Sequence, residues 1–225
     1  MAIVETKDLR KEYRMGKGNF VMALDGVSLE IKKGEFLAIM GPSGSGKSTL
    51  LNMIGALDKP TTGSVLIGGA DITSARNSSL PNIRNQKIGF IFQQYNLVPT
   101  LNAVENVMLP LKYAPGSKSE ARQKAKEALE LVGLSDRMKH KPAELSGGQQ
   151  QRVAIARALV NKPDIILADE PTGELDTHTG KEIINLMLKL NKENGQTFII
   201  VTHNPEIANI CQRTIFVRDG KISSG

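Results

Sequence analysis

The chain has 225 residues, of which 40% are hydrophobic and 23% charged, a mixture typical of a globular protein that buries its own core. Its single cysteine, Cys211, excludes an internal disulfide and fits a reducing compartment. The apolar runs are strand-sized and residues 1–10 carry charge, so we expect neither a membrane-spanning helix nor a signal peptide. The net charge of +6 favours a solvated basic surface and no nucleic acid, because aromatic residues make up only 4% and none lie among the lysines of residues 118–141.

The first part of the chain predicts strands of two kinds. Residues 4–30 alternate apolar and polar side chains in short runs, which is typical of antiparallel strands. Residues 35–40 predict a buried strand, and a glycine-rich loop and a helix over about residues 47–56 follow it. We expect further strands at residues 63–67 and 88–92.

The middle of the chain predicts a helical insertion. No strand pattern occurs between residues 93 and 161, whereas residues 146–160 predict a helix. Another helix is expected over residues 119–132, because its small and apolar residues fall on one helical face: Ala121, Ala125, Ala128, Leu129 and Val132.

Alternating strands and helices return near the C-terminus. Buried strands are predicted at residues 164–168 and 197–202, with a helix over residues 181–191 between them. A hairpin of residues 214–217 and 221–222 closes the chain. Apolar strands that alternate with helices imply a parallel sheet covered by helices.

A phosphate-binding pattern, G-x-x-x-x-G-K-[ST], stands between the strand at 35–40 and the next helix. Its glycines let backbone N–H groups converge on a phosphate, and the helix adds its positive end. Lys47 is expected to hold the β- and γ-phosphates, and the Ser48 hydroxyl to bind Mg²⁺. This loop therefore predicts ATP binding with magnesium. Its residues are Gly41, Pro42, Ser43, Gly44, Ser45, Gly46, Lys47, Ser48 and Thr49.

An acidic pair ends the apolar strand at 164–168. Asp169 is expected beside the magnesium, and Glu170 is placed to polarise the attacking water. The alternative for these residues alone is a strand end with two solvated acids. Next to a phosphate loop the pair favours ATP hydrolysis.

Residues 145–149, Leu-Ser-Gly-Gly-Gln, open the helix at 146–160. Ser146 and Gln149 fit a capping box, and Gly147 and Gly148 leave the helix end bare of side chains, which predicts a second anion site. The alternative is a well-capped helix that binds nothing. Paired glycines cost helix stability, however, and a purely structural cap does not need them.

These motifs resemble those of the ATP-binding-cassette (ABC) nucleotide-binding domains over essentially the full chain. Residues 145–152, Leu-Ser-Gly-Gly-Gln-Gln-Gln-Arg, match the signature of that family. The resemblance implies an α/β fold of the P-loop NTPase (RecA-like) type: a parallel-sheet core, an N-terminal antiparallel β-subdomain and a helical insertion subdomain. We expect one domain over residues 1–225, with the ATP-binding core at about residues 1–92 and 162–225 and the helical signature subdomain at about 93–161.

Four more positions carry over from the family. Tyr13 resembles the aromatic residue that stacks on adenine, and its alternative is a strand residue that packs outward. Gln93 resembles the glutamine that meets magnesium and senses the membrane partner, with Gln94 as the alternative register. His203 resembles the histidine that contacts the γ-phosphate, and Asp176 lies in a loop like the one that crosses the dimer interface. The resemblance thus implies catalytic roles for Glu170, His203, Gln93 and Lys47, nucleotide contacts from Ser146, Gly147, Gly148, Gln149 and Asp176, and metal ligation by Ser48, Gln93 and Asp169.

Two residues depart from the family pattern. Glu174 stands where a small residue is usual, and Asn204 stands where an aspartate is common. Neither removes a catalytic group. Residues 90–99 and 105–110 resemble the separate ATPase subunits of lipoprotein-releasing and of macrolide- or peptide-exporting transporters.

The leading hypothesis is therefore an ATPase that dimerises head to tail around two ATP molecules and drives a membrane permease, as part of an exporter or a lipoprotein- or peptide-extrusion system. The motifs do not identify the transported substrate. The chain itself would be cytoplasmic and peripheral on the inner face of the membrane. One rival is a mechanical regulator of a membrane partner that moves no cargo, as in cell division. Others are a soluble nucleic-acid ATPase and a small-molecule kinase, and the signature motif argues against the kinase.

Overall fold

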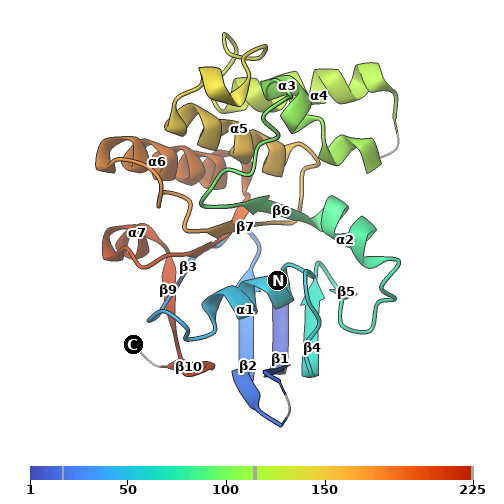
Figure 1. Ribbon diagram of the computed structural model, residues 1–225, viewed down its shortest axis with the longest axis vertical. Coiled ribbons are helices and arrows are strands. Elements are labelled where there is room, and N and C mark those ends of the chain that lie inside the picture. Colours follow the sequence, from blue (N-terminus) through green and yellow to red (C-terminus); the bar gives the residue numbers. More distant parts are fainter. Residues whose placement is uncertain (17, 114–115, 224–225) are drawn as a thin grey trace.

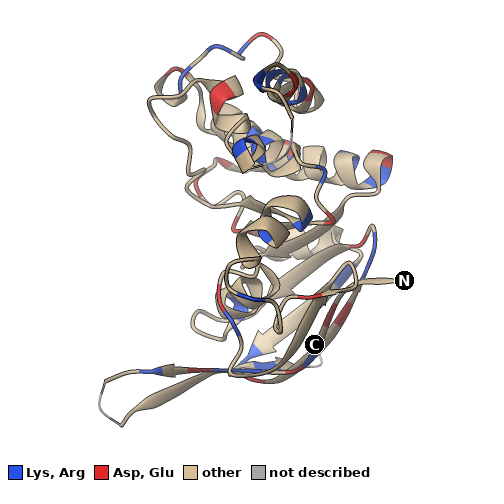
Figure 2. Cartoon of the chain, turned by 90° about the vertical axis from the view of Figure 1, so that its right-hand side faces the viewer, with Lys and Arg blue, Asp and Glu red and all other residues tan. Residues whose placement is uncertain are grey.

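The structure is a computed structural model that describes residues 1–16, 18–113 and 116–223. Two β-sheets of different kinds form the body of the protein (Figure 1). In the first, β1 (Ala2–Arg14) and β2 (Phe20–Lys32) pair as a long antiparallel hairpin, which projects from the body in Figure 2. β4 (Thr62–Ile67) and β5 (Ala70–Asp71) extend this sheet in the order β2–β1–β4–β5. The predicted antiparallel N-terminal strands are confirmed.

The second sheet has the strand order β10–β9–β3–β8–β7–β6. All neighbours pair in parallel except β9 and β10, which form the predicted closing hairpin. Its strands are β3 (Phe36–Met40), β6 (Ile88–Ile91), β7 (Ile165–Asp169), β8 (Thr197–Val201), β9 (Arg213–Arg218) and β10 (Lys221–Ser223).

Alternate residues of the parallel strands face two different cores. Leu37 and Ile199 belong to the core shared with α1 (Lys47–Ile54) and the antiparallel sheet. Phe36 and Phe198 point to the other face, where their ring centroids lie 5.4 Å apart. That face is covered by α5 (Gly147–Leu159) and α6 (Thr177–Asn194). Burial on both faces explains why these strands are continuous apolar runs in the sequence.

The chain between β6 and β7 is helical, and the described residues there, 92–113 and 116–164, contain no strand. Its helices gather on one side of the parallel sheet (Figure 1). Ala125 and Leu129, predicted on one face, lie in the core that also contains Phe198. The elements are α3 (Ala103–Val107), α4 (Lys118–Leu131), α5 and two 3₁₀ turns, Pro110–Tyr113 and Pro142–Glu144.

Several boundaries differ from the prediction. α6 begins at Thr177, four residues before the predicted start at 181, because Asp176 caps the helix ahead of the apolar pattern. α1 ends at Ile54, two residues before the predicted end. Three helices had no predicted counterpart because they are short: α2 (Leu80–Lys87), α3 and α7 (Pro205–Ile210).

Within the described residues, no helix has both the length and the apolar character that crossing a bilayer requires.

Candidate nucleotide site

The phosphate loop joins β3 to α1, and its backbone geometry requires glycine. Gly46 has φ 108°, and a Cβ atom there would collide with the carbonyl oxygen of Ala23. No side chain in the described part of the chain caps α1, so its first N–H groups are left for a ligand. The Ser45 hydroxyl is buried and lacks a partner among the described residues, as expected in a cradle shaped for a polar ligand.

The Lys47 ammonium group lies over this loop. It donates hydrogen bonds to the carbonyl oxygens of Gly41 (2.8 Å) and Pro42 (2.7 Å). The two carbonyl oxygens thus occupy hydrogen bonds of the ammonium group that phosphate oxygens would accept in the ATP-bound protein. Ser48, next along the helix, is exposed. Lys47 is therefore held where the pattern places it.

Asp169 ends β7 close to this cation. Burial raises the pKa of its carboxyl group, the charge of Glu170 raises it further, and the charge of Lys47 opposes both. A raised carboxyl pKa indicates that the ionised form lacks sufficient positive charge around it. A cation that arrives with a nucleotide would supply that charge.

Glu170 and His203 follow the neighbouring strands β7 and β8, and their side chains form a hydrogen bond with each other. His203 Nδ1 lies 2.8 Å from Glu170 Oε1, and because an ionised carboxylate only accepts, Nδ1 donates the hydrogen. The Glu170 N–H also donates to the Val201 carbonyl oxygen (3.0 Å), which fixes the residue against β8. Glu170 has φ 47°, the left-handed region that is uncommon outside glycine and clusters at functional sites. The structure thus brings together Asp169, Glu170 and His203.

Tyr13 lies on β1 and is half-buried. Its hydroxyl donates to Asp58 Oδ2 (3.1 Å), and the Lys11 ammonium lies 4.9 Å from the ring centroid. Burial raises the pKa of Tyr13, and Asp58 adds to this. The Tyr13 hydroxyl thus lies beside α1, close to Thr49 as well as to Asp58, and the stacking role of Tyr13 stays a prediction.

Gln93 lies two residues past the end of β6 and is exposed. Its Nε2 donates to Glu174 Oε1 at 3.1 Å. Among the described residues it makes no hydrogen bond to Ser48 or Asp169, the other two predicted metal ligands. Its role at a metal, like the choice between Gln93 and Gln94, stays a prediction.

The signature residues open α5 as a complete capping box. Ser146 Oγ accepts from the Gln149 N–H (3.3 Å), and Gln149 Oε1 accepts from the Ser146 N–H (3.0 Å). The glycines, however, are not left bare. A Cβ at Gly148 would collide with the Thr179 methyl group of α6, and one at Gly147 would lie 2.9 Å from the Tyr95 hydroxyl. Close packing on Thr179 therefore gives Gly148 a structural reason of its own, and the second anion site stays a prediction.

Asp176 also has a structural task. Its carboxylate caps α6 by accepting from the Thr179 N–H (3.0 Å) and from the Thr179 hydroxyl (2.6 Å). These hydrogen bonds lower the pKa of Asp176. Its predicted place at a dimer interface is neither required nor opposed by this cap.

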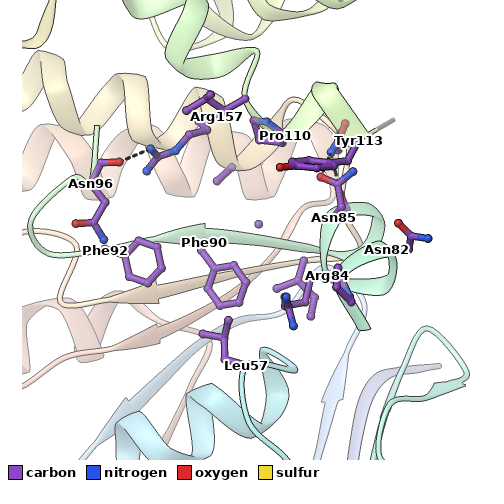
Figure 3. Close-up of a pocket in the computed structure, with 16 residues that line it drawn as sticks. Leu57, Asn82, Arg84, Asn85, Phe90, Phe92, Asn96, Pro110, Tyr113 and Arg157 are labelled. Carbon is purple, nitrogen blue, oxygen red and sulfur yellow. Dashed lines mark hydrogen bonds between the residues drawn. The ribbon is translucent and has the colours of Figure 1, made fainter. Parts of the chain in front are cut away.

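A groove of about 670 Å³ lies between the end of α2, β6 and the start of the helical region (Figure 3). Its floor includes Phe90 and Phe92, whose rings stack with centroids 5.7 Å apart. Residues 93–110 were expected to form part of a groove for a helix of the membrane subunit, with Tyr95, Leu97 and Val98 exposed along it. Asn96, Leu109 and Pro110 do line the groove. Tyr95, Leu97 and Val98 do not, and Leu97 packs against the core instead. The signal that marks the groove is a set of exposed apolar side chains distant in sequence, Leu57 and Tyr113.

Comparison with known proteins identifies the family. The family described as ABC transporter matches residues 24–173. The ABC transporter ATP-binding protein YknY of Bacillus subtilis (strain 168) is 52% identical over 98% of this chain and 95% of its own length. The macrolide export ATP-binding/permease protein MacB of Mannheimia succiniciproducens is 50% identical, and the aligned region covers 99% of this chain but 34% of that protein.

A solved structure agrees in fold. The ATP-binding cassette MJ0796, described in a dimeric post-hydrolysis state bound to ADP and Pi, superposes with a TM-score of 0.88 and 51% sequence identity, covering 98% of this chain and 97% of that one. MJ0796 comes from Methanocaldococcus jannaschii. The predicted P-loop NTPase fold is confirmed. The chain belongs to the ABC transporter family, as an ATP-binding cassette that binds and hydrolyses ATP.

Proposed function

We propose that two copies of this chain close head to tail around two ATP molecules and drive a membrane permease that exports a lipoprotein, peptide or macrolide. The observation that carries the proposal is the meeting of Lys47, at the start of α1, with Asp169, Glu170 and His203 at the ends of parallel strands. The dimeric MJ0796 cassette and the ATP-binding/permease name of MacB support it. The chain would be cytoplasmic and peripheral on the inner face of the membrane. A regulator that moves no cargo would differ only in its partner.

The site fits magnesium. The donor set is all oxygen, namely the Ser48 hydroxyl, the Asp169 carboxylate and the Gln93 amide, and Mg²⁺ prefers oxygen ligands with few carboxylates and substrate phosphates completing the shell. The raised pKa of Asp169 indicates a carboxylate short of positive charge. When bound, the ion neutralises charge that develops on the β- and γ-phosphate oxygens.

The remaining groups have separate tasks. Lys47 exchanges its two loop carbonyls for phosphate oxygens, and the α1 N–H groups bind the same phosphates. Glu170 accepts a proton from the attacking water, with His203 fixing one of its carboxylate oxygens. Tyr13 stacks on the base.

The second phosphate site belongs to the other copy. Ser146 opens α5 in the proposed helical subdomain, about residues 93–161, whereas Lys47 lies in the proposed ATP-binding core, about residues 1–92 and 162–225. A two-fold dimer lets each α5 N-terminus, with Gly147, Gly148 and Gln149, reach the γ-phosphate bound by its partner. Asp176 would lie at the same interface.

Replacement of the general base tests the proposed chemistry. Glu170→Gln keeps the size of the side chain but removes its basicity, so we expect hydrolysis to fall by about 10²–10⁴-fold while ATP binding persists. Turnover is measured by phosphate release and binding by calorimetry. A control, Glu182→Gln, changes an exposed glutamate of α6 and should leave both unchanged. Hydrolysis within threefold of wild type would reject Glu170 as the base.

The groove of Figure 3 is the proposed permease contact. Its apolar floor suits the hydrophobic face of a short helix, and its two charged lining residues, Arg84 and Arg157, are both basic. Both arginines also donate to backbone carbonyl oxygens of this chain, so they are fixed in place. We infer that the occupant is a cytoplasmic helix of the permease that carries at least one carboxylate.

Charges placed in the groove test this contact. Leu57→Glu and Tyr113→Glu alter lining residues whose side chains are 48% and 79% exposed, so the chain itself should fold normally. We expect loss of co-purification with the permease and unchanged basal hydrolysis. Leu131→Glu on α4, at 56% exposure, is the matched control. Co-purification equal to that of the control would refute the groove as the docking site.

A further inference from the structure

Glu174 is the departure from the family pattern that the structure connects to the nucleotide site. Its Oε1 accepts a hydrogen bond from Gln93 Nε2 at 3.1 Å, although both side chains are exposed. We propose that Glu174 is a positioning residue that holds the Gln93 amide with its oxygen free to face magnesium. This inference rests on the proposed role of Gln93 as a metal ligand.

The argument depends on the chemistry of an amide. A primary amide has one accepting end, Oε1, and one donating end, Nε2, and the two differ little in shape. A carboxylate only accepts, so the hydrogen bond to Glu174 requires that Nε2 faces it. The oxygen is then the end left for another partner. Mg²⁺ binds oxygen, and an amide turned the other way would present N–H groups to the cation.

Two further contacts hold the loops of this pair together. Gly173 packs so closely against Gln93 that a Cβ there would lie 2.8 Å from Nε2. The Tyr95 hydroxyl lies 3.5 Å from the Glu174 carbonyl oxygen, and burial together with the charge of Glu174 raises the pKa of Tyr95. Arg157 of α5 donates to the carbonyl oxygens of Tyr95 and Asn96, which fixes the loop after β6.

The same loop is tied to the proposed base. The Gly173 N–H donates to the Glu170 carbonyl oxygen (3.0 Å), and the Leu175 N–H donates to that of Thr172 (3.1 Å). Glu174 is thus part of a turn that begins at Glu170. Through it, the turn after β7 determines how the Gln93 amide is oriented before metal and nucleotide arrive.

A competing interpretation predicts the opposite sign. If Glu174 were a latch that holds Gln93 away from the metal, its removal would make Mg²⁺ bind more tightly. If it orients the amide, its removal makes Mg²⁺ bind more weakly, because a freely turning amide presents the wrong end part of the time.

The test measures, by calorimetry on the full chain, how the binding of a non-hydrolysable ATP analogue depends on the Mg²⁺ concentration. For Glu174→Ala we expect the half-saturating Mg²⁺ concentration to rise about two- to tenfold, the effect of one hydrogen bond. Analogue binding in EDTA should stay unchanged. Glu174→Gln keeps an accepting oxygen and should restore at least half of the loss on a logarithmic scale.

The chain offers a matched control. Glu127 of α4 accepts from Gln123 Nε2 at 3.0 Å, also on the surface, so Glu127→Ala removes the same charge and the same type of hydrogen bond elsewhere. It should leave the Mg²⁺ titration unchanged. Tighter Mg²⁺ binding by Glu174→Ala, a titration equal to that of Glu127→Ala, or an equal loss in Glu174→Gln would each overturn the proposal.

Gln93→Ala separates this inference from the proposed function. If Gln93→Ala weakens Mg²⁺ binding and Glu174→Ala does not, the positioning role alone is wrong. If Gln93→Ala has no effect, Gln93 is not a ligand and both proposals about it fail.

Discussion

The chain has two glycine-rich helix starts, and they are built in opposite ways. α1 begins at Lys47 after a left-handed Gly46, and no described side chain caps it or pairs with the nearby Ser45 hydroxyl. α5 begins at Gly147 with a complete capping box, and Gly148 packs tightly against α6. The first helix start is open, whereas the second already satisfies part of its own hydrogen-bonding capacity.

This difference teaches which site can act alone. An uncapped helix N-terminus beside a lysine binds phosphate within one chain. A capped one has fewer free N–H groups, so its ligand must be held in place by something else first. In the proposed dimer, that support is the ATP bound at α1 of the other copy. In the proposed mechanism the two starts are therefore a primary site and a secondary site.

Removal of the lysine should have the largest effect on this comparison. Lys47→Ala deletes two charged hydrogen bonds to phosphate, and charged hydrogen bonds contribute about 1.5–3 kcal/mol each, so ATP affinity should fall by on the order of a hundredfold or more. Calorimetry at low protein concentration measures binding to single chains. Lys189→Ala, an exposed lysine of α6, is the control. Wild-type affinity in Lys47→Ala would remove the distinction between the two helix starts.

Gly148 tests whether the second start needs glycine for packing or for phosphate. Gly148→Ala forces a methyl group against the Thr179 methyl, and overpacking of this kind costs about 1–3 kcal/mol, so the melting temperature should fall. Thr179→Ser removes the opposing methyl and keeps the hydroxyl that Asp176 accepts from. The double variant should regain stability by thermal denaturation. No recovery would mean that the collision with Thr179 is not the cause.

Loss of the cap should have the smallest effect. Ser146→Ala removes the cap of α5 and should cost about 1 kcal/mol of stability. Ser117→Ala is a matched control, because Ser117 caps α4 in the same capping-box arrangement with Glu120. Denaturant unfolding should give similar losses for both, whereas phosphate release should slow only in Ser146→Ala. Equal hydrolysis in the two variants would indicate that Ser146 is only a cap.

The fold followed from the sequence where local pattern and burial agree. β3, β7 and β8 are apolar at every residue except Asp169 and Thr197 at strand ends, because both faces are covered, so their positions were predicted within a residue or two. α2 and α7 were missed because each is at most eight residues long and starts near a proline, with a weak apolar face. The start of α6 was missed because the cap at Asp176 precedes the apolar pattern.

The site was predictable where a motif determines backbone geometry and less so where contacts join distant loops. Lys47 and Glu170 lie where the motifs indicate. The packing of Gly148 on Thr179 and the contact of Gln93 with Glu174 join residues 31 and 81 positions apart, which no local pattern records. The groove has the same character, since its walls come from separate segments.

Size-exclusion chromatography with light scattering on Glu170→Gln tests the central claim most directly. The account predicts a dimer with saturating ATP, a monomer with ADP, and a monomer again when Ser146→Arg is added, because the bulky side chain blocks the α5 N-terminus while ATP still binds at α1. A Glu170→Gln chain that stays monomeric in ATP at high protein concentration would contradict the claim. So would a dimer that persists after Ser146→Arg.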